Sequence, residues 1–97
     1  MPSVTDFTSE AQMRAMADAR GWNDGMALAD AHSVVFETVT PERVVAVVNA
    51  PDGQARVELT TTGSRFGYDC SCWEVPEACR HIVATAMALP RYHAPEA

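Results

Sequence analysis

The sequence contains no lysine and no long hydrophobic run. Its seven arginines are outnumbered by 13 aspartate and glutamate residues, and the formal net charge is −6. A negatively charged chain repels a phosphate backbone, which argues against a general nucleic-acid binder. No apolar stretch has the length of a transmembrane helix, and residues 1–10 lack the basic start and apolar run of a signal peptide. We therefore expect a cytoplasmic protein without a membrane segment.

Aromatic residues are also scarce. They make up 7% of a chain that is 47% hydrophobic, so alanine and valine supply much of the apolar content. A chain of 97 residues is near the lower size limit for independent folding, and a bound metal would help to stabilise its small core. We expect one domain over residues 1–97, with a core at about 9–89 and a flexible tail at 91–97.

Two helices are predicted, one near each end. The pattern Ser9-x-x-Gln12 is typical of a capping box and predicts a first helix over residues 10–20 that stops at Gly21. Asparagine, aspartate and glycine at residues 23–25 then indicate a turn. The last helix is expected to end at Pro90, because proline cannot continue a helix.

The segment between the helices predicts a sheet. Four strand-like stretches are separated by short turns, and the second is a continuous apolar run that suits a central strand. Strands joined by short turns pair as an antiparallel meander, so we expect an α+β fold. The predicted strands cover residues 34–39, 43–49, 55–60 and 65–69, and the predicted last helix covers 82–89.

All three cysteines and one histidine lie in a single short run. Cys70, Cys72, Cys79 and His81 make a complete set of tetrahedral zinc ligands. In an extended strand Cys70 and Cys72 would be too far apart for one ion, so the chain must bend at Ser71. Residues two apart on a helix do not face each other, so Cys79 must precede the last helix and His81 must lie in its first turn.

Other interpretations of this run explain less of it. A disulfide between Cys70 and Cys72 would close a small, strained ring and leave Cys79 and His81 without a role. A catalytic cysteine–histidine pair needs a third orienting group, and no such motif is visible. A catalytic zinc keeps one coordination position open, whereas four protein ligands close the site. We therefore expect one structural Zn²⁺ and no enzymatic activity.

The spacing Cys-x-Cys, six residues and Cys-x-His resembles the SWIM zinc finger. The resemblance implies a helix, a meander of valine-rich strands, a zinc knuckle and a closing helix, with the ligand roles falling on the four residues named above. It also implies a module that binds protein or DNA, since relatives occur beside helicase, transposase and recombination-linked proteins. Family members often have proline directly after the second cysteine, where this chain has Trp73.

Two functional hypotheses follow. The first is a small adaptor that binds another protein, with Trp73 and Arg80 as candidate contacts. Trp73 is interpreted either as an interaction anchor or as a lid or core residue at the zinc site, and Arg80 either offsets the charge of that site or is an ordinary surface residue. The second is a DNA-binding finger in recombination, repair or transcription, which would require several arginines to cluster on one face. The net charge favours the adaptor.

Overall fold

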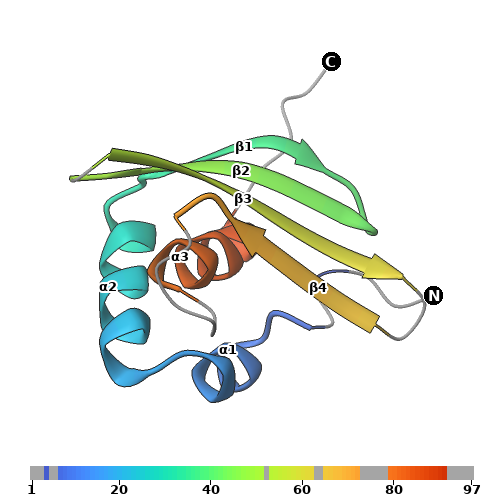
Figure 1. Ribbon diagram of the computed structural model, residues 1–97, viewed down its shortest axis with the longest axis horizontal. Helices are drawn as coiled ribbons and strands as arrows, with labels where there is room; N and C mark the ends of the chain where they lie inside the picture. The colour runs from blue at the N-terminus through green and yellow to red at the C-terminus, as the bar shows by residue number, and fades with distance from the viewer. Residues whose placement is uncertain (1–3, 5–6, 52, 63–64, 73–78, 92–97) are drawn as a thin grey trace.

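Three α-helices pack on one face of a four-stranded antiparallel sheet (Figure 1). The computed structural model describes residues 4, 7–51, 53–62, 65–72 and 79–91. The predicted α+β class is confirmed. The elements are α1 (Glu10–Met16), α2 (Ala19–Asp30), β1 (Val34–Val39), β2 (Arg43–Ala50), β3 (Gly53–Thr62), β4 (Arg65–Cys70), α3 (Arg80–Ala88) and the short 3₁₀ helix η2 (Leu89–Arg91).

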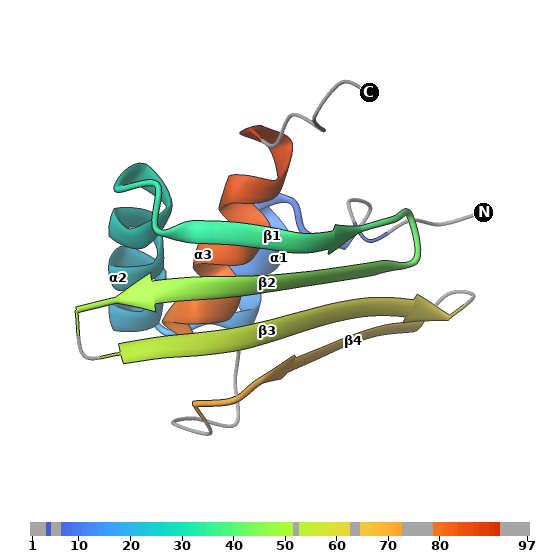
Figure 2. The same ribbon diagram turned by 90° about the horizontal axis from the view of Figure 1, so that it is seen from above.

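The sheet is the predicted meander, with spatial order β1-β2-β3-β4 (Figure 2). Val44 lies opposite Leu59, and Val57 lies opposite Cys70, so one continuous apolar face runs across three strands. These four side chains are buried beneath the helices. The apolar run of β2 therefore forms a central strand, as predicted.

The N-terminal helical region differs from the prediction. The helix expected over residues 10–20 ends at Met16, and a second helix runs from Ala19 through the predicted turn at residues 23–25. The Asp18 carboxylate accepts a hydrogen bond from the Gly21 amide at 2.6 Å and so caps a new helix start. The capping box at Ser9 is confirmed, although it begins a shorter helix than expected.

Gly25 explains why the predicted turn is a helix instead. A Cβ atom at this position would lie 2.5 Å from Val83 Cβ and 2.8 Å from the Arg80 carbonyl oxygen. The missing side chain lets α2 approach α3 closely. Local sequence favours a turn here, but the packing of the two helices offsets that preference.

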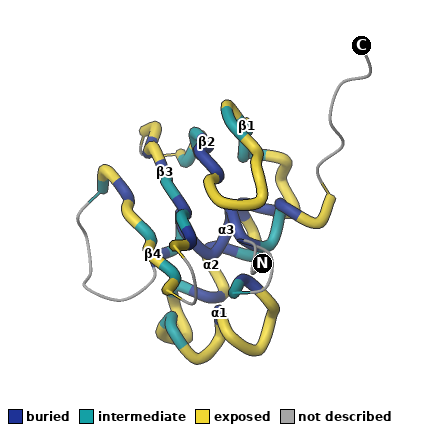
Figure 3. The backbone as a smooth tube through the Cα atoms, turned by 90° about the vertical axis from the view of Figure 1, so that its right-hand side faces the viewer, coloured by how far each residue is buried: buried dark blue, intermediate teal, exposed yellow. Residues whose placement is uncertain are grey.

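Helix α3 is the centre of the core. It lies between the sheet on one side and α1 and α2 on the other, and Figure 3 shows it buried along most of its length. Its one buried hydroxyl, on Thr85, donates to the His81 carbonyl oxygen at 2.9 Å and is therefore satisfied. The predicted stop near Pro90 is also observed, because α3 ends at Ala88 and passes into η2. Residues 92–97 of the predicted flexible tail lie outside the described residues.

Substitution Gly25→Ala is expected to destabilise the protein. Alanine favours a helix by about 1 kcal/mol over glycine, but overpacking a core contact costs about 1–3 kcal/mol, and contacts under 3 Å put this site at the upper end. Urea unfolding followed by circular dichroism measures the difference. Asn23→Ala, exposed on the same helix, is the matched control and should be neutral or slightly stabilising. A Gly25→Ala protein as stable as the wild type would contradict the close helix contact.

Candidate metal centre

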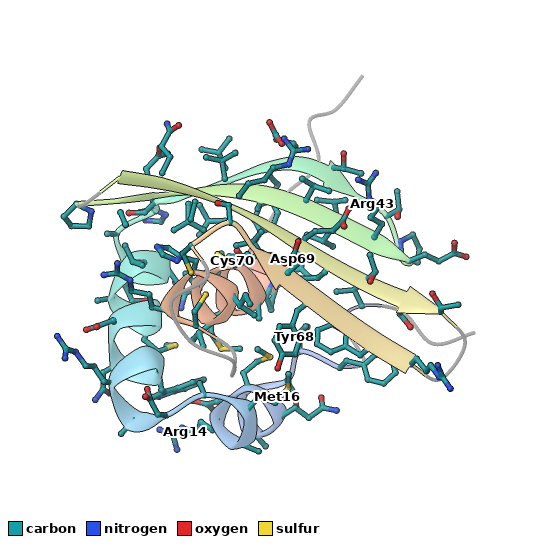
Figure 4. All side chains as sticks on the ribbon, viewed as in Figure 1. Arg14, Met16, Arg43, Tyr68, Asp69 and Cys70 are labelled. Carbon is teal, nitrogen blue, oxygen red and sulfur yellow. The ribbon has the colours of Figure 1, made fainter. Side chains whose placement is uncertain are left out.

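The first two cysteines lie where the sheet ends. Cys70 is the last residue of β4, next to α3 in Figure 4, and the chain turns at Ser71 and Cys72. Two hydrogen bonds attach this turn to β3. The Ser71 amide donates to the Arg56 carbonyl oxygen at 3.0 Å, and the Ser71 hydroxyl accepts from the Arg56 amide at 2.9 Å. The predicted bend at Ser71 is therefore present and is held by β3.

The other two ligands lie at the start of α3. Cys79 is the N-cap residue, with extended backbone angles, and His81 follows in the first helical turn, as predicted. The Cys79 thiol makes no capping hydrogen bond, although this position commonly carries a side chain that does. It contacts the other sulfur and nitrogen ligand atoms instead, with its Sγ 3.6 Å from Cys72 Sγ.

The four ligand atoms have the spacing of a tetrahedral metal site. His81 Nδ1 lies 3.6 Å from Cys70 Sγ and 3.8 Å from Cys79 Sγ, and all four atoms lie within 4.8 Å of one another. Bonds of about 2.3 Å to sulfur and 2.0 Å to nitrogen in a tetrahedron place sulfur atoms about 3.8 Å apart and sulfur and nitrogen about 3.5 Å apart. The residues are therefore positioned to bind one metal ion, with Nδ1 as the histidine ligand atom.

The site is shielded from solvent on most sides. Cys70, Cys79 and His81 are buried and Cys72 is half-buried. All three cysteines are free thiols. Four protein ligands fill a tetrahedral shell.

The pKa values of two of the thiols shift in opposite directions. A hydrogen bond with Cys70 lowers the pKa of Cys79, and this effect outweighs the burial that opposes ionisation. The pKa of Cys70 is raised, first because it hydrogen-bonds to Cys79 and then because burial disfavours its thiolate. These shifts favour ionisation of Cys79 over Cys70, and a bound metal would displace the protons from all of its thiol ligands.

Of the two candidate contact residues, Trp73 and Arg80, the structure describes only Arg80. Trp73 lies outside the described residues. Arg80 is the first residue of α3, between Cys79 and His81 in sequence; it is half-buried, and its Nε atom is shielded from solvent. The two hydrogen bonds between Ser71 and Arg56 were not predicted from the sequence. They join residues that are far apart along the chain, and no local pattern indicates such a contact.

Comparisons with models of protein families, with curated proteins and with solved structures find no match. The cluster of Cys70, Cys72, Cys79 and His81 is compatible with a zinc finger. The likeness to SWIM fingers therefore rests on the spacing of these ligands and the order of the elements around them. Among the described residues, no helix is long and apolar enough to cross a membrane.

Substitution Cys72→Ser is expected to cost more stability than any core truncation in the sheet. Structural zinc contributes about 10–16 kcal/mol of apparent binding free energy at neutral pH, comparable to the stability of a whole domain. Leu59→Ala, in the buried face of β3, is the comparison and should cost about 2–5 kcal/mol. Thermal melts of both variants, with metal content measured in parallel, test this order. If Cys72→Ser melts within a few degrees of the wild type, the site does not stabilise the fold.

Proposed function

We propose that this chain is a small module stabilised by one structural Zn²⁺ and that it binds another protein. The observation that carries the proposal is the closed Cys₃His cluster, which links the end of β4 to the start of α3. Three sulfurs and one imidazole at tetrahedral spacing suit Zn²⁺ among the common biological metals. With every position of the shell taken by a protein ligand, no position remains for a substrate or an activated water, so the proposal includes no enzymatic activity.

The distribution of arginines favours a protein partner over nucleic acid. On the sheet, Arg43 pairs with Glu58 at 2.7 Å and Arg56 pairs with Glu37 at 3.1 Å. At the ends of α2, the chain forms two further arginine–aspartate pairs, Arg20 with Asp24 and Arg91 with Asp30. Each of these cations already faces a carboxylate, and they lie on different elements, so they do not add up to the positive stripe that phosphates require.

The open face of the sheet provides surface for a protein. The described helices cover one face only, and the other face is free of them (Figure 2). The large hydrophobic side chains that are exposed in the described part of the chain, Val35 and Val39, both lie on the edge strand β1. These two valines offer apolar surface to a protein, whereas phosphate binding requires cations.

The alternative function is a DNA-binding finger in recombination, repair or transcription. Its support is the resemblance of the ligand spacing to SWIM fingers. The ion pairs described above and the net charge of −6 weigh against it.

Purified protein is expected to contain one zinc ion per chain and to lose it together with its fold on acidification. Protons compete with the metal for thiolate and imidazole, so lowering the pH releases the ion. Elemental analysis measures the zinc content, and circular dichroism follows α3 over the same pH range. No zinc after purification without chelator would contradict the proposal, and so would helical signal and zinc content that change at clearly different pH values.

The protein is expected to bind DNA weakly, if at all, at physiological salt, and to retain a protein partner in affinity capture. Trp73→Ala should leave the zinc content intact while weakening that capture, because Trp73 follows the ligand Cys72 in sequence and aromatic residues often dominate the energy of protein contacts. Binding to duplex and single-stranded DNA is measured by fluorescence anisotropy at several salt concentrations. Tight, salt-sensitive DNA binding by the wild type would overturn the adaptor and support its alternative.

A further inference from the structure

Cys72 is the most exposed of the four residues in the metal centre. Cys70, Cys79 and His81 are 7%, 3% and 3% exposed, whereas Cys72 is half-buried in the turn after β4. A metal-bound cysteine is deprotonated, so a loaded site holds Cys72 as a thiolate, which is the form that oxidants attack. Oxidation of cysteine is selective for accessible thiolates. A small oxidant that approaches the site therefore reaches Cys72 before the other two cysteines.

A second thiol lies close enough to complete a disulfide. Cys79 Sγ is 3.6 Å from Cys72 Sγ. A movement of about 1.5 Å therefore brings the two sulfurs to the disulfide distance of about 2.05 Å. Their bond closes a larger ring than the strained one between Cys70 and Cys72. Cys70 is also held in place, because it is the last residue of β4 and pairs with Val57 (Figure 4). The geometry thus favours Cys79 as the partner of Cys72.

We propose that Cys72 is a site of oxidation by hydroperoxides and that its disulfide with Cys79 releases the metal. The Cys72 thiolate attacks the terminal peroxide oxygen, the O–O bond breaks, and the other oxygen leaves and takes up a proton to become water or an alcohol. The Cys79 thiolate then attacks the sulfenic acid on Cys72. The S–S bond forms, and the departing hydroxide takes up a proton to become water. The two sulfurs have then given two electrons to the peroxide.

Disulfide formation leaves only Cys70 and His81 as ligands. A structural zinc site uses four protein ligands, so the ion leaves when two of them are consumed. The fold loses stability with the ion, because the binding energy of a structural metal is part of the folding energy. A thiol reductant restores both thiols by exchange, and the site then binds zinc again. The inference rests on the zinc of the proposed function and adds its regulation by oxidants.

Treatment of the zinc-loaded protein with equimolar hydrogen peroxide tests the inference. A chelating dye measures the zinc released, and circular dichroism follows α3. We expect zinc release in proportion to disulfide formation, with both reversed by dithiothreitol and added zinc.

Mass spectrometry identifies the two cysteines that form the disulfide. A glutamate-specific protease cuts after Glu74 and Glu77, which separates Cys79 from the other two cysteines. We expect the fragment with Cys79 to be cross-linked to the fragment with Cys70 and Cys72. Alkylation of the remaining thiol should label Cys70.

Two histidine substitutions keep four zinc ligands and separate the roles of the thiols. Cys72→His removes the accessible thiol and should slow zinc release by peroxide about tenfold or more. Cys70→His is the matched control at a buried ligand. It retains the pair of Cys72 and Cys79 and should release zinc within about twofold of the wild-type rate. If either variant fails to bind zinc, the mapped disulfide of the wild type decides the question.

The outcomes separate this inference from the proposed function. A protein that keeps its zinc in peroxide, or whose disulfide joins any pair other than Cys72 and Cys79, would overturn the inference and leave the structural zinc in place. Equal rates of zinc release for Cys72→His and Cys70→His would also overturn it, and so would zinc loss that dithiothreitol cannot reverse. A purified protein without zinc would overturn the proposed function as well.

Discussion

The fold depends on the cluster of three sulfur atoms and one imidazole that links the last strand of the sheet to the central helix. Cys70 ends β4, while Cys79 and His81 begin α3, so one ion would hold both ends of the connecting segment. A nine-residue helix such as α3 is marginal by itself in water. A metal bond at its first turn would compensate for the small hydrophobic core of a short chain.

The core itself depends on small side chains brought close together. Three of the nine residues of α3 are alanines, and the missing side chain of Gly25 allows α2 to contact α3 closely. Close approach gives these small residues the dispersion contacts that larger side chains would supply elsewhere. It also brings α2 close to the start of α3, where both helices line a cleft of about 520 Å³ together with the β2–β3 turn.

The proposed function places recognition outside the metal site. The cluster is enclosed and would have no open coordination position, so binding falls to surfaces that the cluster holds in place. Arg80 connects the two: its backbone lies between metal ligands and its side chain lines the cleft.

Sequence alone determined the features that depend on local chemistry. The ligand set, the bend at Ser71, the order of the four strands and the capping box at Ser9 all follow from residue types and their spacing. The continuous helix α2 and the cleft were decided only by tertiary structure. Residues 23–25 are helical although their local sequence favours a turn. The close packing of Gly25 against Val83 stabilises the helix and offsets that local preference. The cleft draws its walls from α2, the β2–β3 turn and the start of α3, and no local pattern records that these distant segments meet.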